Sequence, residues 1–347
     1  MRVESFKDGV IYRGNNPYGE SRLANAPQHG AMTGCPIMGA LMPRQWGGNA
    51  RMCTYEVRRN DAKAELAWQG AGVGSDVASV YYEDRALFQI NKDLVIPSGV
   101  GASDGDVFSL QKTTHEAVLR AIIGCFYTGK LEAGGVFEQY FTPENAPKVT
   151  AAAQWTASSG NPLLDIHAVF DAQADHGVDR SKAVVLSRTA CNKFMSHPSI
   201  IDWAKASQDG SPLSLVVSLP SSGTMQGTGG AGAFADEASW MDKAGTQTVT
   251  DNPWFDIVGM FAGIVVLRDR AGLLQADTAL FLPQVDSSGR GYRAVFGPVD
   301  VGGERVDGQI CVAKRGGRSG CRLEASSNFG LMLDDGNPWH AVILDGI

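Results

Sequence analysis

The stretch QWTASSGNPLLDIHAVFDAQADHG, residues 154–177, decides the fold of this chain. After a loop bounded by Pro162, apolar residues recur at the spacing of one helix face: Leu163, Ile166, Val169 and Phe170. Gly177 then supplies a C-terminal stop. The segment therefore predicts a helix that buries one face and ends at this glycine.

The residues that follow predict a mixed lobe of strands and helices. AVVLS (183–187) is typical of a short buried strand, Ser187 is a helix N-cap, and Pro198 fits the start of a further helix. Further apolar runs predict strands at 213–219, 263–267 and 278–282, and helical stretches are predicted at about 235–243 and 253–262.

The longest helix is predicted upstream, within residues 103–130. Apolar residues recur there at roughly helical spacing, and the first turn is acidic. Ser103 followed by Asp106 is an N-cap signature, and we expect Gly134-Gly135 to end the pattern. In the last sixty residues, the sequence predicts strands separated by glycine-rich turns.

The first ninety residues lack the pattern of a self-contained core. Residues 1–45 are rich in Gly, Asn and Pro with little periodicity, which predicts an extended arm. Residues 50–57 and 77–83 favour strands, and the polar, glycine-rich segment between them predicts the tip of a long protruding hairpin. Such elements have no core of their own and become ordered only by packing on another surface.

Composition excludes several classes of protein. Lys and Arg number 30 against 37 Asp and Glu, a net charge of −7, which does not suit tight binding to nucleic-acid phosphates. No apolar run approaches the ~20 residues that span a bilayer, so we expect a soluble, intracellular protein. The six cysteines show no CxxC spacing, and the histidines form no cluster, so no metal is predicted.

Three local motifs raise the question of an enzyme. Gly227-x-Gly229-x-x-Gly232 has dinucleotide-loop spacing, but residues 220–223 separate it from the preceding apolar run. Ser103 lies in a Gly-x-Ser-x-Gly pattern, yet the capping role accounts for it. Cys191 and His197 could form a thiol and base, although no third orienting group is evident. We therefore predict no catalytic residue and no cofactor.

The order of motifs along the chain is more informative than any one of them. Trp155-x-x-Ser158, Asn-Pro, Asp-Ile, a short apolar strand, a helix and His-Pro-x-Ile follow the long helix in succession. In this order the chain resembles the major capsid proteins of tailed bacteriophages, whose fold is named for coliphage Hong Kong 97. The resemblance covers nearly the whole chain, although none of these motifs is specific alone.

The resemblance implies an α+β fold of four parts. These are an N-terminal arm (1–45), an extended hairpin loop (46–90), a peripheral domain with a long spine helix (91–162 and 292–347) and an axial domain (163–291). The implied function is that of a structural subunit, not an enzyme, which self-assembles into pentamers and hexamers of an icosahedral head enclosing double-stranded DNA. The implied location is the virion, after assembly in the host cytoplasm.

The resemblance also implies partners and contact residues. The expected partners are other copies of the chain, portal, scaffold and decoration proteins, and packaged DNA bound without sequence specificity, with no membrane. The hairpin tip would contact neighbouring subunits through Arg58, Arg59, Lys63, Glu65 and Trp68. A glycine-rich loop would lie on the axial or outer surface through Gly227, Gly229, Gly230 and Gly232.

Two alternatives stay open at this point. An encapsulin-type nanocompartment shell shares the fold but encloses enzyme cargo. A soluble α/β hydrolase or dinucleotide-binding enzyme, using Ser103 or the Gly227 loop, belongs to a different class and predicts a small oligomer with a deep polar pocket. Both shell interpretations depend on large interfaces between subunits. Obligate interfaces commonly bury ~2,000–5,000 Å², enough to offset the free-energy cost of ordering an arm.

Overall fold

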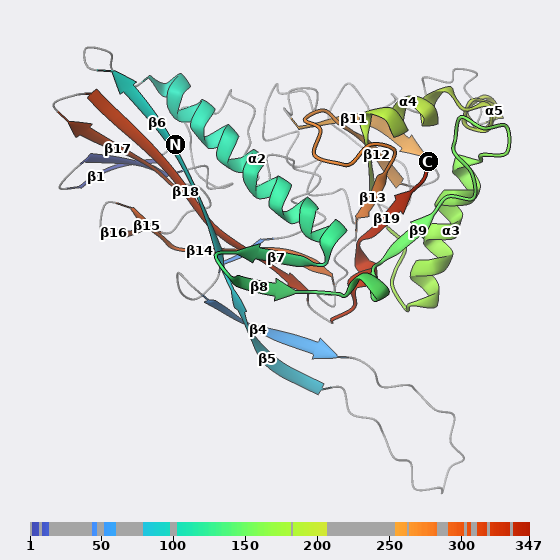
Figure 1. Ribbon diagram of the computed structural model, residues 1–347, viewed down its shortest axis with the longest axis horizontal. Helices are drawn as coiled ribbons and strands as arrows, with labels where there is room; N and C mark the ends of the chain where they lie inside the picture. The colour runs from blue at the N-terminus through green and yellow to red at the C-terminus, as the bar shows by residue number, and fades with distance from the viewer. Residues whose placement is uncertain are drawn as a thin grey trace, which may run out of the picture.

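The computed structural model shows an elongated body from which a two-stranded hairpin projects (Figure 1). It describes residues 2–6, 9–13, 44–46, 52–59, 79–97, 103–181, 183–206, 254–261, 264–282, 291–301, 304–306, 311–317, 320–333 and 336–347. Two large sheets and one long helix make up most of the body. The strands and helices predicted at 213–219 and 235–243 lie outside the described residues.

The long helix α2 (Asp104–Thr128) begins where its cap predicts. The Ser103 hydroxyl accepts the Asp106 N–H at 3.2 Å, and the Asp106 carboxylate accepts the Ser103 N–H at 2.9 Å, so the capping box is complete. The helix ends at Gly129, which adopts a left-handed φ of 73°. The prediction that Gly134-Gly135 ends it is wrong, because Gly129 is reached first. Those two glycines instead form the turn between strands β7 (Lys130–Ala133) and β8 (Val136–Gln139).

The larger sheet has seven strands arranged around the long strand β18. In order, β1, β2, β17, β18, β14 and β3 are neighbours, and β6 pairs with the other edge of β18. Their bounds are β1 Arg2–Phe6, β2 Gly9–Arg13, β3 Arg44–Trp46, β6 Phe88–Pro97, β14 Tyr292–Gly297, β17 Cys311–Gly317 and β18 Gly320–Leu333. All pairs are antiparallel except β14 with β3. The strands predicted in the last sixty residues are thereby confirmed.

Two short stretches of the N-terminal segment, which its composition predicts to be an extended arm, form paired strands. β1 and β2 form a hairpin, and β2 pairs with β17 from Arg13 opposite Cys311 to Gly9 opposite Arg315. The pairing itself was not predicted, because the partner strand is about 300 residues away in the sequence and local patterning does not reveal such a partner. Residues 14–43 lie outside the described part of the chain.

The second sheet has six strands in the order β11-β12-β10-β13-β19-β9. Their bounds are β9 Lys148–Thr150, β10 Ala183–Leu186, β11 Phe255–Phe261, β12 Ile264–Asp269, β13 Ala279–Leu282 and β19 Val342–Asp345. The helical prediction for 253–262 is wrong, because this segment pairs along β12 as β11, with a register shift between Ile257 and Gly259. A short apolar run is ambiguous between helix and strand, and the available sheet edge decides it here.

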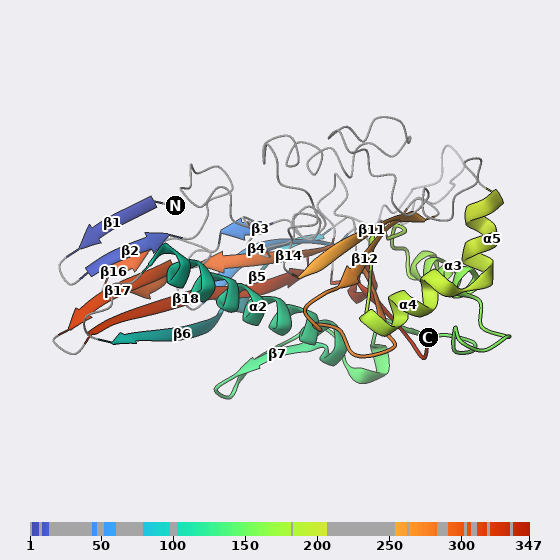
Figure 2. The ribbon, with the colours of Figure 1, turned by 90° about the horizontal axis from the view of Figure 1, so that it is seen from above.

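Three helices pack beside this sheet: α3 (Pro162–Asp175), α4 (Arg188–Ser196) and α5 (Pro198–Ala206). Figure 2 shows them gathered at one end of the molecule, opposite β1 and β2. The N-cap predicted at Ser187 is confirmed by its hydroxyl, which accepts the Ala190 N–H at 3.3 Å. Gly177 has a φ of 68° just after α3, as its predicted role as a helix stop requires.

Side chains on the two faces of the six-stranded sheet enter two different cores. From β10, Ala183 and Val185 join the core around α2, whereas Val184 and Leu186 join the core around α3 and α4. β13 and β19 alternate in the same way, so the sheet is buried on both faces, as its uninterrupted apolar strands require.

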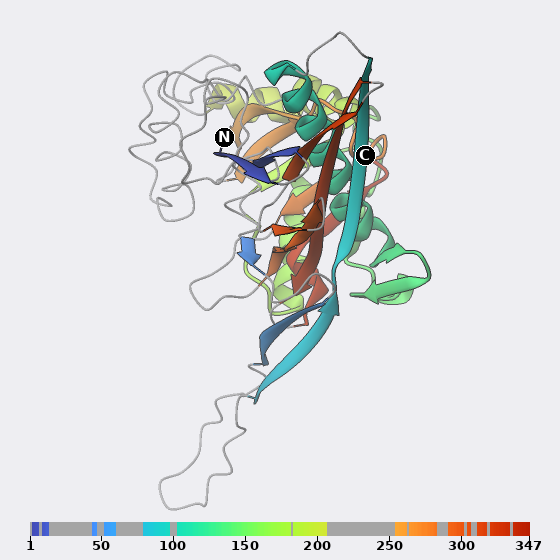
Figure 3. The same cartoon turned by 90° about the vertical axis from the view of Figure 1, so that its left-hand side faces the viewer.

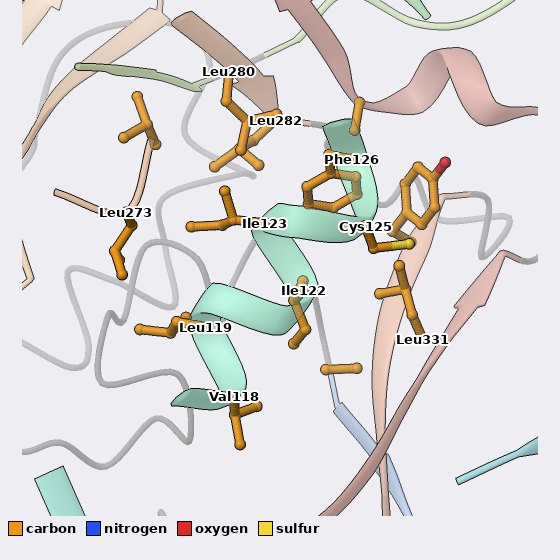
Figure 4. Packing of buried hydrophobic residues seen from close by; sticks show 14 of the residues in the cluster. Val118, Leu119, Ile122, Ile123, Cys125, Phe126, Leu273, Leu280, Leu282 and Leu331 are labelled. Carbon is orange, nitrogen blue, oxygen red and sulfur yellow. The ribbon is translucent and has the colours of Figure 1, made fainter. Parts of the chain in front are cut away.

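Helix α2 packs against both sheets. Its C-terminal half contributes Ile122, Ile123 and Phe126 to a cluster that includes Leu280 and Leu331 from the two sheets (Figure 4). Its N-terminal half packs through Val107 and Leu110 on β6, β17 and β18. Helix α2 therefore packs with residues of both sheets.

Candidate assembly surfaces

The first candidate surface is the ribbon made by β4 (Met52–Arg59) and β5 (Ser79–Ala86). These strands pair antiparallel from Met52 opposite Ala86 to Arg59 opposite Ser79, which confirms the two strands expected near 50–57 and 77–83. Figure 3 shows the ribbon extending away from the body. Because an isolated two-stranded ribbon is marginally stable in water, this element has reason to pack on another surface.

The structure describes only two of the residues predicted to contact neighbouring subunits. Arg58 and Arg59 lie on β4 at the end of the ribbon remote from the body, opposite Val80 and Ser79. Lys63, Glu65 and Trp68 lie outside the described residues, as do Gly227, Gly229, Gly230 and Gly232. Their roles in contact between subunits and on an axial or outer surface stay predictions.

A second projecting element, the β7–β8 hairpin, was not singled out by the sequence. Val136 and Phe137 follow its Gly-Gly turn and are 54% and 59% exposed. Successive strand residues point to opposite faces, so the hairpin presents one apolar side chain on each face. A Val-Phe pair directly after a two-glycine turn was the signal that could have located it.

The candidate nucleophile Ser103 serves as a helix cap. Its hydroxyl donates to the Asp106 carboxylate at 2.7 Å, and both residues are at the exposed start of α2. The hydrogen bonds from the Ser103 side chain and then its backbone lower the pKa of Asp106. The hydroxyl is therefore held by a carboxylate of its own capping box, which is a structural arrangement.

The candidate thiol and base are also engaged in structure. Cys191 is buried on α4 among the apolar residues beside the six-stranded sheet, and this burial raises the pKa of its thiol to about 11. A thiol with so high a pKa is a poor nucleophile at neutral pH. His197 follows α4, and its Nδ1 lies 2.8 Å from the Ser199 hydroxyl, where it helps to join α4 to α5.

A concavity of about 430 Å³ lies where the C-terminal end of α2 meets β9 and β19. Two acidic residues in its lining, Asp277 and Asp345, form ion pairs with Lys193 at 2.8 Å and Lys148 at 2.5 Å. The hydrogen bonds from Lys193 and then Thr189 lower the pKa of Asp277. These ion pairs stabilise the junction between the segments that line the hollow.

The part of the chain that the structure describes holds neither a cluster of metal ligands nor a membrane-spanning helix. There, no three His, Cys, Asp or Glu residues are grouped as metal ligands would be. No helix in the same residues is long and apolar enough to cross a membrane.

Known proteins resemble this chain in structure. No protein-family model matches the sequence, and no curated protein does. The capsid of a native GTA particle matches with a TM-score of 0.50 at 12% identity, over 89% of this chain and 90% of that one. The chain has a capsid fold. The resemblance predicted from the order of motifs is confirmed at the level of the fold.

Two other capsid structures match this chain with similar identity, coverage and TM-scores. The putative capsid protein of a prophage of E. coli CFT073 is 10% identical over 90% of this chain and 93% of its own, with a TM-score of 0.48. The capsid of Myoviridae phage XM1 is 12% identical over 90% and 91%, with a TM-score of 0.47.

Proposed function

We propose that this chain is a major capsid protein, a structural subunit that assembles with copies of itself into the closed icosahedral head of a tailed phage. The observation that carries the proposal is the match to the GTA capsid, which extends over 89% of the chain and so includes more than one sheet or motif. Other copies of the chain are its principal partners.

The projecting elements support this role on physical grounds. The β4–β5 ribbon and the β7–β8 hairpin are each two-stranded, and neither encloses a core. In a shell they would gain stability by burying surface on neighbouring subunits, as obligate interfaces do. We assign these contacts to Arg58, Arg59, Lys63, Glu65 and Trp68. The charged residues among them would fix the relative position of neighbouring subunits more than they would raise the affinity between them.

The chemistry of the chain supports a structural role over catalysis. Ser103 caps a helix, and burial raises the pKa of the Cys191 thiol to about 11. The net charge of −7 suits an inner wall along which packaged DNA slides without adhering. Portal, scaffold and decoration proteins are further partners of this proposed assembly in the virion, and we place the loop containing Gly227, Gly229, Gly230 and Gly232 at an axial or outer surface.

Electron microscopy of the full-length chain tests the proposal. Expression alone, and with any scaffold encoded beside it, should yield closed shells of tens of nanometres with pentameric and hexameric capsomers. Nuclease-protected DNA in particles from the native source supports a phage head, whereas a co-purifying enzyme cargo would assign the shell to an encapsulin. A soluble monomer or small oligomer under all these conditions would overturn the proposal.

A further inference from the structure

The base of the β4–β5 ribbon is held by specific contacts to the body. β5 ends at Ala86 and β6 begins at Phe88, so one nearly continuous strand runs from the ribbon into the seven-stranded sheet. The direction of the ribbon is therefore decided in the few residues around Leu87.

Glu138, on β8, is bonded to two consecutive residues at this point. Its Oε1 accepts the Ala86 backbone N–H at 2.7 Å, and its Oε2 accepts the Arg85 guanidinium at 3.0 Å. The Arg85 and Glu138 side chains are only 24% and 17% exposed. A charge-assisted pair in so sheltered a position is stronger than an exposed ion pair.

The segment that carries Glu138 is itself attached to the body. The Tyr140 N–H donates to the Gly129 carbonyl at 2.8 Å, at the end of α2, and the Tyr140 hydroxyl donates to the Leu331 carbonyl on β18 at 2.5 Å. The Arg85 guanidinium also lies 5.5 Å from the centre of the Tyr140 ring. Glu138 thus joins the ribbon to a segment bonded to both the helix and the central strand.

A glycine on β18 forms a second contact with the base of the ribbon. A Cβ on Gly330 would lie 2.9 Å from the Leu87 Cδ2 and 3.2 Å from the Ala86 carbonyl oxygen. The backbone of the ribbon base therefore passes closely over β18, where a larger residue would push it away.

We propose that Glu138 is a positioning residue that sets the direction in which the ribbon leaves the body. The ribbon's eight-residue strands are about 25 Å long at ~3.3 Å per residue. A change of about 20° at the base would move the far end by about 9 Å, more than a hydrogen bond tolerates. The effect on a shell rests on the proposed function, whereas the effect on the ribbon base does not.

Hydrogen exchange and electron microscopy of the full-length chain test this role with a matched pair of variants. Glu138→Ala removes both bonds to the ribbon, whereas Glu132→Ala removes an exposed ion pair with Lys130 within the same hairpin. In the unassembled chain, the peptide containing Ala86 should exchange about tenfold faster or more in the Glu138 variant, the size expected for a lost charge-assisted hydrogen bond. The Glu132 variant should exchange like the wild type.

The yield of closed shells is the measurement that a purely structural role of Glu138 would leave unchanged. At an unchanged melting temperature, Glu138→Ala should give several-fold fewer closed shells than Glu132→Ala. Glu138→Gln, which keeps an acceptor for Ala86 and loses the charge, serves if the alanine variant does not fold, and should show the same direction of change in both measurements.

Two results would overturn the inference: equal exchange at Ala86 in the Glu138 and Glu132 variants, or faster exchange accompanied by normal shells. If the wild-type chain itself forms no shells, the proposed function is overturned, and the exchange comparison alone decides whether Glu138 holds the ribbon.

Discussion

Replacing Gly129 by alanine should destabilise the protein at the C-terminal end of its long helix. Gly129 ends α2 with a φ of 73°, a conformation that costs an L-residue about 1–2 kcal/mol. An added Cβ would also lie 2.3 Å from the Phe141 carbonyl oxygen and 2.7 Å from its Cδ2. Overpacking of this kind costs a further ~1–3 kcal/mol, so we expect the free energy of unfolding to fall by about 2–5 kcal/mol.

Gly134→Ala is the matched control. Gly134 has a φ of 59°, but a Cβ there would meet no atom within 4 Å, so only the conformational cost of about 1–2 kcal/mol applies. Urea unfolding of the unassembled chains, followed by tryptophan fluorescence, compares the two variants. If Gly129→Ala costs no more than Gly134→Ala, the close packing of Phe141 against the end of α2 is refuted.

Two further predictions concern ionisable groups. Because the folded-state pKa of Asp277 is lowered by Lys193, its contribution to stability is present above the ordinary value of 3.8 and is lost as the pH falls through the folded value. Asp277→Asn, which keeps a residue tolerant of its φ of 56°, should therefore cost about 0.5 kcal/mol at neutral pH, since the pair is partly exposed, and nothing in strong acid. An equal loss at every pH in thermal unfolding would contradict this assignment. Burial raises the pKa of Cys125 to about 12 and that of Cys191 to about 11, so neither thiol should react with iodoacetamide in the folded chain at about pH 8, while the less buried Cys321 should react. Peptide mass spectrometry measures this, and modification of Cys191 as fast as Cys321 would show that its burial is wrong.

Local signals predicted the elements that depend on local chemistry. The cap at Ser103, the stop at Gly177 and the buried strand at 183–186 could be identified because each needs only a few adjacent residues. The order of these elements, taken together, was sufficient for the capsid fold.

Elements that depend on distant partners were not predictable in the same way. β11 is a strand because β12 offers it an edge, and β1 and β2 are strands because β17 does. The position of Glu138 beside Arg85 follows from the way two hairpins meet, 53 residues apart in the sequence. The sequence pattern of neither segment predicts this contact.

The place of β19 in the six-stranded sheet has a consequence for the timing of synthesis. Val342–Asp345 lie between β13 and β9, and Val342 and Ile343 enter the two different cores. A nascent chain still attached to the ribosome without these residues has a gap inside that sheet and leaves both cores open. The subunit therefore cannot complete its second sheet or close either core until these residues have been translated.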